Sequence, residues 1–165
     1  MIATAKLIGR FDEEAVILLY ATSGLSRDQE TATPGPGAWT ISELVAHLLD
    51  TDLVMADRMK RILAENDPTL IPFAENAWIE RLHSKAMPVE EAVNLFVAHR
   101  HWMSRILKKC TDADFARTGQ HLELGRVTLA EVLIKAVNHV DHHLPFLYAK
   151  RANLGVSVLP RYSTD

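Results

Sequence analysis

The sequence has little cysteine, no long apolar run and no excess of basic residues. Cys110 is the single cysteine, which excludes an internal disulfide and a cysteine-rich zinc finger and fits a reducing compartment. No apolar run approaches the roughly 18 residues of a membrane span. Lys and Arg total 18 against 21 Asp and Glu, whereas a domain that holds a phosphate backbone is normally basic. We therefore expect neither a membrane nor a nucleic acid as partner.

What is present is an ordinary globular composition with one unusual count. The 165 residues suit one domain, and 48% of them are hydrophobic, which is enough for a sizeable core. Asp12, Glu13 and Glu14 interrupt the stretch in which an export signal would be apolar, so we expect a cytoplasmic location. The unusual count is eight histidines.

Apolar residues recur at helical spacing in four segments, and no segment of strand period appears between them. Thr40 and Thr128 each begin a Thr-x-x-Glu capping box, which marks the start of a helix. The pattern predicts an all-α four-helix bundle in a single domain over residues 1–153, followed by a tail over 154–165. The four expected helices cover residues 2–23, 40–65, 88–109 and 128–153.

The connections after the second and third helices are longer than an up-down bundle needs, so at least one crossover is expected. Residues 74–85 predict a short helix within the first of these connections, with Trp78 and Leu82 pointing inward. Residues 121–124 predict a brief extended piece within the second.

Three histidines are placed on matching flanks of two expected helices. His139 and His143 are four residues apart and therefore stack on one face of the fourth helix, and His47 lies on the flank of the second. Three neutral imidazoles with a vacant fourth position make an open, catalytic-type site for a divalent metal. The alternative is a set of histidines at the edge of the core that make ordinary hydrogen bonds.

Other polar residues are weaker candidates for catalysis. His99 lies on the apolar stripe of the third helix, where a core histidine with one hydrogen bond is the favoured interpretation and a group facing the metal is the other. Arg58 and Arg100 are expected at the surface, although either could reach over the site to an anionic substrate group. Glu43 could be a general base, but its capping role already explains it. Trp39 is interpreted as a structural staple ahead of a helix.

Three elements of the sequence resemble motifs of the DinB/YfiT-like proteins. Residues 37–48 (GAWTISELVAHL) resemble the G-x-W-S/T-x-x-E-x-x-x-H-L pattern that begins that family's second helix. Residues 121–128 (HLELGRVT) are similar to the lead-in to its last helix, and residues 139–144 (HVDHHL) to its closing H-x-x-H-H element. The resemblance implies a bundle with a crossover, often dimeric, and one divalent ion (zinc, nickel, iron or manganese) on His47, His139 and His143.

The resemblance also implies a function. Relatives of this kind include transferases that use a low-molecular-weight thiol as cosubstrate, so we expect a metal-dependent enzyme that transfers a thiol to a small electrophile. Metal-dependent hydrolysis of a small molecule is the enzymatic alternative, because a metal also activates bound water. A non-catalytic binding module clamped by the metal is the third. Phe146 stands where the family often has a polar residue, commonly Gln, which leaves the substrate less certain than the ligands.

Overall fold

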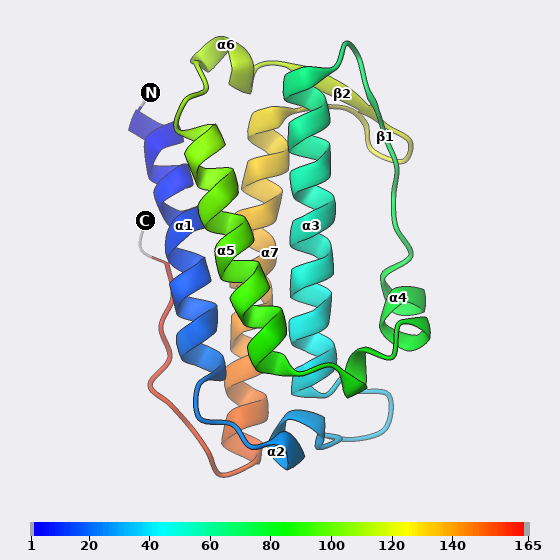
Figure 1. The fold of residues 1–165 in the computed structure, drawn as a ribbon, viewed down its shortest axis with the longest axis vertical. Coiled ribbons are helices and arrows are strands. Elements are labelled where there is room, and N and C mark those ends of the chain that lie inside the picture. The colour runs from blue at the N-terminus through cyan, green and yellow to red at the C-terminus, as the bar shows by residue number, and fades with distance from the viewer. Residues whose placement is uncertain (1, 164–165) are drawn as a thin grey trace.

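The computed structural model describes residues 2–163, and four long helices dominate it (Figure 1). The prediction of a helical four-helix bundle is confirmed, and each long helix begins and ends within a few residues of its expected bounds. Thr40 and Thr128 form the expected capping boxes at the second and fourth of them. The long helices are α1 (Ile2–Thr22), α3 (Ile41–Ala64), α5 (Val89–Leu107) and α7 (Leu129–Asn153).

The order of the helices in space explains the crossover. In Figure 1, α1 and α7 run downward while α3 and α5 run upward. Helix α1 packs against α5 and α7, and α3 packs against the same two helices. Because α3 and α5 are parallel neighbours, the chain must return along the whole bundle between them. The crossover therefore lies in residues 65–88, and the short helices α2 (Arg27–Thr31) and α6 (Asp112–Phe115) lie in the other connections.

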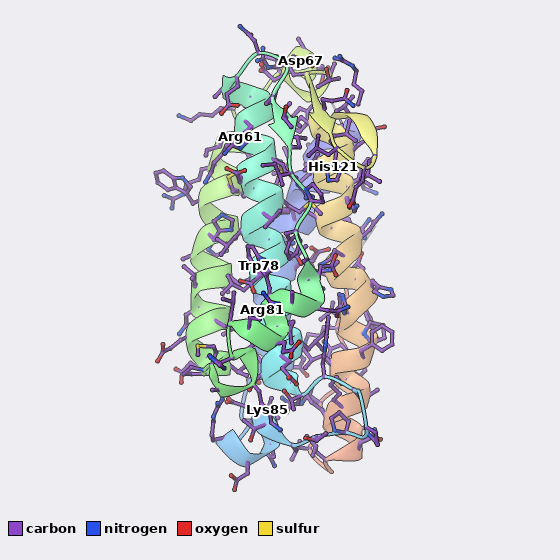
Figure 2. All side chains as sticks on the ribbon, turned by 90° about the vertical axis from the view of Figure 1, so that its right-hand side faces the viewer. Arg61, Asp67, Trp78, Arg81, Lys85 and His121 are labelled. Atoms are coloured by element: carbon purple, nitrogen blue, oxygen red, sulfur yellow. The ribbon has the colours of Figure 1, made fainter. Side chains whose placement is uncertain are left out.

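The crossover connection contains the predicted short helix, here α4 (Glu75–Arg81), followed by a 3-10 turn over Ser84–Ala86. Figure 2 shows the connection in front of α3 and α7. The prediction that Trp78 and Leu82 point inward is wrong, because they are 37% and 53% exposed, and Ile79 is the buried residue of α4. A helix of seven residues that lies outside the bundle can bury only a narrow face.

A small sheet holds the upper end of the crossover, which corrects the expectation that strands are absent. β1 (Thr69–Leu70) pairs in parallel with β2 (Thr118–His121), which pairs antiparallel with β3 (Gly125–Thr128). Strands of two to four residues are too short for a periodic pattern. The piece expected to be extended at 121–124 includes the turn between β2 and β3. A Cβ atom on Gly119 would lie 3.0 Å from Leu70 Cδ1, so the Leu70 side chain packs closely against β2 at a position that has no side chain.

The core between the long helices is mainly apolar, and a charged cluster lies at its centre. The expectation that Arg100 lies at the surface is wrong, because only 1% of it is exposed. Its Nε donates to Asp52 Oδ1 at 2.8 Å, and its Nη1 donates to Glu14. Its guanidinium also lies 4.2 Å from the ring centroid of Phe11 and 4.7 Å from that of Phe96. The Asp52 carboxylate, the hydrogen bond to Glu14 and two aromatic faces thus offset the cost of burying the charge.

Arg58, also expected at the surface, is buried under the crossover. Its Nη2 donates to the carbonyl oxygen of Ile71 at 2.8 Å, immediately after β1. Nη1 lies 3.7 Å from Met55 Sδ on the same helix, and the carbonyl satisfies Nη2, while Nε has no hydrogen-bond partner among the described residues. The side chain therefore ties the crossover to α3.

The segment after α7 runs back along the bundle (Figure 1). Tyr20 donates from its hydroxyl to the carbonyl oxygen of Leu159 at 3.0 Å, and the Arg161 guanidinium lies 3.8 Å from the Tyr20 ring centroid. The Tyr148 hydroxyl donates to the Arg161 carbonyl oxygen at 2.9 Å. Residues 154–163 thereby contact both α1 and α7. Within residues 2–163, no helix is long and apolar enough to cross a membrane.

Candidate metal centre

Three histidines converge between α3 and α7. One ring nitrogen of each of His47, His139 and His143 lies within 4.8 Å of the others, and His47 Nε2 and His139 Nε2 are 3.0 Å apart. The ring centroids are 4.6 to 4.9 Å apart, with the rings steeply inclined to one another. These are the histidines that the sequence places on matching flanks of two helices. We call them the histidine triad.

Helix packing and capping explain why the triad forms. Thr40 Oγ1 accepts the backbone N–H of Glu43 at 3.2 Å, which fixes the first turn of α3 two turns before His47. Leu44 and Leu48 of α3 are buried in one apolar cluster with Val140 and Leu144 of α7. Since these residues interleave with the histidines along each helix, the apolar contact brings the imidazoles together.

Burial keeps the triad uncharged. Burial, and then the nearby His143 and His47, lowers the pKa of His139 from 6.5 to about 3. Burial and His47 lower the pKa of His143 to about 4, and burial also lowers the pKa of His47. All three imidazoles are therefore neutral at pH 7, which is the form that binds a metal.

The triad also fits a divalent ion in its geometry. Two nitrogens bound at about 2.0–2.1 Å to one tetrahedral ion lie roughly 3.3 Å apart, close to the 3.0 Å between His47 and His139. Nδ1 of His143 is buried and has no hydrogen-bond partner among the described residues. A buried nitrogen without a partner destabilises the fold unless something else satisfies it. The set of three neutral nitrogens therefore suits a metal, and the role of these residues as ligands stays a prediction.

Glu75 is a neighbour of the triad that sequence reasoning missed. It begins α4, and its Oε2 lies 3.9 Å from His47 Nε2, with 54% of the side chain exposed. Its negative charge opposes the effect of burial on the pKa of His47. No residue spacing relates α4 to the long helices, because the crossover alone sets its position. The sequence therefore carried no signal for this carboxylate.

The three weaker catalytic candidates have other partners. His99 Nδ1 lies 2.8 Å from Asp52 Oδ2, in the hydrogen-bonded core position that was the favoured interpretation. Arg100 donates to Asp52, Glu14 and backbone carbonyls. Glu43 Oε2 accepts the backbone N–H of Thr40 at 2.7 Å, as a cap does. These contacts are structural, and the structure does not bring the three residues onto the triad.

His143 of the triad lines an open cleft of about 410 Å³. Trp39 lies on one side of it, with its ring centroid 4.9 Å from that of His47. Phe146 contacts His142 and His143, at centroid distances of 5.3 and 6.1 Å. Trp39 therefore contacts a candidate ligand as well as preceding a helix. Six of the residues that line this cleft are Trp39, Leu44, Asn76, His143, Phe146 and Lys150.

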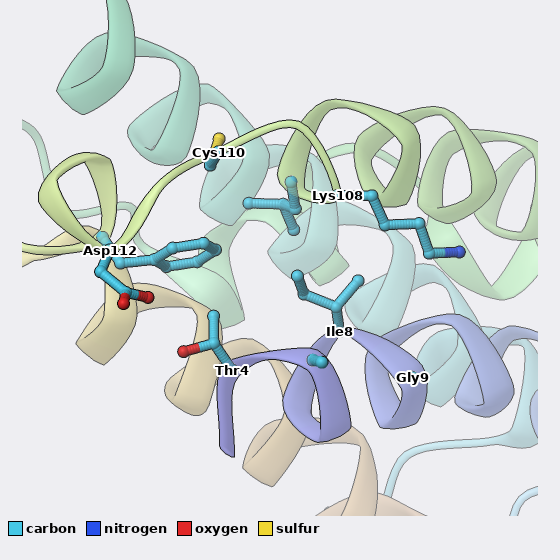
Figure 3. A pocket seen from close by; sticks show the side chains of 9 residues that line it. Thr4, Ile8, Gly9, Lys108, Cys110 and Asp112 are labelled. Atoms are coloured by element: carbon cyan, nitrogen blue, oxygen red, sulfur yellow. The ribbon is translucent and has the colours of Figure 1, made fainter. Parts of the chain in front are cut away.

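A second pocket contains the single cysteine and lies at the other end of the bundle. It has a volume of about 270 Å³ and is formed where α1 begins and α5 ends (Figure 3). Cys110 Sγ donates to the carbonyl oxygen of Ile106 at 3.5 Å. Burial and the nearby Asp114 raise the pKa of the Cys110 thiol. This thiol is held protonated and far along the bundle from the triad, so it is no nucleophile for that site.

The fold and the triad define a class of protein: a four-helix bundle with one crossover, in which three histidines from two helices converge beside a cleft. Comparison with known proteins then identifies the family. The model of the DinB superfamily matches residues 10–147, so the chain belongs to the DinB superfamily.

Individual relatives have related names. Proteins of Oceanobacillus iheyensis and Bacillus mycoides are 29% and 31% identical to this chain over 138 residues, which is 83% of this chain and 79% of each relative. Both are named "putative metal-dependent hydrolase". The structure of YfiT from Bacillus subtilis superposes with a TM-score of 0.86 at 26% identity, covering 93% of this chain and 89% of YfiT. YfiT is described as "a probable metal-dependent hydrolase with an unusual four-helix bundle topology".

Proposed function

We propose that this protein is a divalent-metal-dependent hydrolase of a small molecule. The observation that carries the proposal is the triad, in which three uncharged imidazoles converge beside an open cleft. The names of its relatives favour hydrolysis over other metal chemistry. In this proposal His47, His139 and His143 hold the ion. Bound there, a divalent ion supplies Lewis acidity and lowers the pKa of a bound water towards about 7.

The protein's own residues have distinct tasks in this proposal. The three histidines supply neutral ligands, which leaves the positive charge of the ion uncompensated. Glu75, 3.9 Å from His47 Nε2, accepts a hydrogen bond from the attacking water and orients it. In hydrolysis the water oxygen bonds to the electrophilic atom, the bond to the leaving group breaks, and the leaving group takes a proton from the water. The cleft beside Trp39 and Phe146 receives the substrate.

Thiol transfer, which the sequence resemblance implies, uses the same histidines with a thiolate in place of hydroxide. The two reactions differ only in the nucleophile, so one set of assays separates them. The third possibility, a binding module clamped by the metal, predicts metal binding without turnover of either kind. The homodimer also stays a prediction, which light scattering at micromolar concentration checks.

The experiment compares wild type with two single-histidine variants. Each is loaded with zinc, nickel, iron or manganese and analysed for metal content. We expect about one ion per wild-type chain and little in His143→Ala. His101→Ala is the matched control, because His101 is an exposed histidine of α5 that lies outside the triad and does not line the cleft. Equal metal content in wild type and His143→Ala would refute the metal centre.

Activity is then measured on the loaded proteins. Aryl esters report hydrolysis, and a chloro-aromatic acceptor with several low-molecular-weight thiols reports thiol transfer. We expect ester hydrolysis above the uncatalysed rate in wild type and loss of it in His143→Ala and Glu75→Gln. Conjugation without hydrolysis would replace the proposal with thiol transfer. Metal binding without either activity would favour the binding module.

A further inference from the structure

The cleft beside the triad has an unusual wall. Phe146 is 50% exposed although it is aromatic and lies next to polar histidines. Trp39, from the loop before α3, lines the same cleft. A large exposed aromatic side chain costs free energy in water, and apolar surface beside a few polar groups is typical of a small-molecule site. The wall therefore offers flat apolar surface to a ligand.

The charge in this cleft is of one sign. Among the described residues that line it, Lys150 is the one with a permanent charge, and no carboxylate is present. Lys150 Nζ donates to the carbonyl oxygen of Trp39, and an ammonium group has two further N–H donors. The nearest acidic influence on Lys150 is Glu43, whose Oε2 accepts two hydrogen bonds from Thr40. The ammonium group is thus available to an anion in the cleft.

The spacing of the cleft-lining side chains along α7 limits the length of a ligand that spans the cleft. Phe146 and Lys150 are four residues apart and share a face of the helix. Lys150 lies seven residues after His143, and a rise of about 1.5 Å per residue puts them roughly 10 Å apart along the helix axis. A ligand that reaches from the triad to Lys150 passes Phe146 on the way. Its ends are therefore separated by at most about 10 Å, since the Lys150 side chain leans back toward the start of α7.

We propose that the cleft binds a small carboxylate with a flat apolar middle. The carboxylate pairs with Lys150, the flat group lies against Trp39 and Phe146, and the reacting group, at most about 10 Å from the carboxylate, lies at the triad. This inference rests on the proposed function and names its substrate class. Because the three histidines are uncharged, they do not themselves select an anion. In this proposal Lys150, one helix turn beyond Phe146, recognises it.

The test uses a probe with all three parts, 4-(2-carboxyethyl)benzohydroxamate, whose hydroxamate binds metals. Calorimetry on the zinc-loaded protein measures its dissociation constant. We expect Lys150→Gln to bind the probe about tenfold more weakly, and Lys150→Arg to restore most of the loss. Phe146→Ala should cost roughly fivefold. Lys135→Gln is the matched control, because Lys135 is an exposed lysine of the same helix that does not line the cleft.

The uncharged carboxamide of the probe isolates the ion pair. It should bind wild type about tenfold more weakly than the acid and lose nothing further in Lys150→Gln. Equal affinity of wild type for acid and carboxamide would overturn the inference while leaving the metal centre intact. The zinc content of the same samples separates that result from failure of the metal centre.

A second measurement does not need the metal. In metal-free protein, 3-phenylpropanoate should shift the indole N–H resonance of Trp39, which Trp39→Phe identifies by its disappearance. Lys150→Gln should reduce the shift at a given concentration, and Lys135→Gln should not. An unperturbed Trp39 resonance at millimolar 3-phenylpropanoate would contradict the proposed binding mode.

Discussion

Two polar clusters lie inside this bundle, and they differ in how their polar atoms are satisfied. In the charged core cluster, which we define as Glu14, Asp52, His99 and Arg100, the arginine bonds both carboxylates and two backbone carbonyls. In the histidine triad, imidazole nitrogens face one another across 3.0 Å, and His143 Nδ1 has no partner among the described residues. One guanidinium donates to most of the first cluster, whereas the second has no such shared donor; each leaves one buried atom, Glu14 Oε1 or His143 Nδ1, without a partner among the described residues.

The contrast distinguishes structural from functional polar groups. Buried polar groups that pair with one another hold elements together, and here they join α1, α3, α5 and α7 through one guanidinium. Polar groups that converge without pairing destabilise the metal-free fold, and they persist where a ligand completes them. Loss of the first cluster should therefore reduce stability, and loss of the second should reduce ligand binding.

The largest expected effect is on the charged core cluster. Arg100→Leu leaves the Asp52 carboxylate without its cation and Glu14 without its hydrogen-bond donor, and breaking a buried ion pair in this way costs about 3–5 kcal/mol of unfolding free energy. Urea denaturation of the metal-free protein measures it. Arg105→Leu is the matched control on the exposed side of the same helix, where a change within about 0.5 kcal/mol is expected. A fully stable Arg100→Leu protein would remove the structural role assigned to the cluster.

The next largest effect is expected at the histidine triad. His139→Ala removes one of three nitrogens, and loss of a direct ligand should weaken zinc binding by more than the 10–100-fold typical of residues that only support ligands. The unfolding free energy of the metal-free variant should change by less than about 1 kcal/mol, since no strong hydrogen bond is lost. Competition with a chelator gives the zinc affinity. A large loss of metal-free stability with unchanged affinity would reverse the roles of the two clusters.

The sequence predicted the elements that depend on local pattern. Helical periodicity and the capping boxes of Thr40 and Thr128 located α3 and α7. Those two helices carry the triad, so its three members followed from spacing alone. The strands of two to four residues were missed because their pairing is tertiary: β1 joins β2 from about 50 residues away in the sequence.

What the sequence could not predict are the partners of charged residues. Arg100 resembles a surface residue in isolation, because its burial depends on carboxylates contributed by α1 and α3. Glu75 reaches the triad only through the path of the crossover. Phe146 was recognised as a departure from the family pattern, but its place in the cleft wall required the packing of α7 beside Trp39.

A smaller effect concerns pH and the charged core cluster. Burial raises the pKa of Glu14 from its ordinary value of 4.5 to about 8, although Arg100 opposes the shift. The folded protein thus retains a proton between pH 4.5 and 8 that the unfolded chain releases, so this contribution to stability is complete below pH 4.5 and is lost as the pH rises to 8. Glu14→Gln should flatten that decline in urea midpoints measured from pH 5 to pH 9. Glu91→Gln, an exposed control on α5, should retain it.

The smallest effect concerns the N-cap of α3, whose loss should lower both the unfolding free energy and the zinc affinity of the triad. Thr40→Ala removes the hydroxyl that accepts the backbone N–H of Glu43, and a lost cap costs about 1 kcal/mol of unfolding free energy. Thr128→Ala removes the equivalent hydrogen bond at α7 and should cost about the same.

The two variants should differ in their effect on the triad. Thr40 precedes His47 by two turns, whereas Thr128 precedes His139 by three. Thr40 also adjoins Trp39, whose ring contacts His47. We therefore expect zinc affinity to fall several-fold in Thr40→Ala and to be unchanged in Thr128→Ala. Equal zinc affinities would show that the packing of α3 against α7, rather than the first turn of α3, fixes His47.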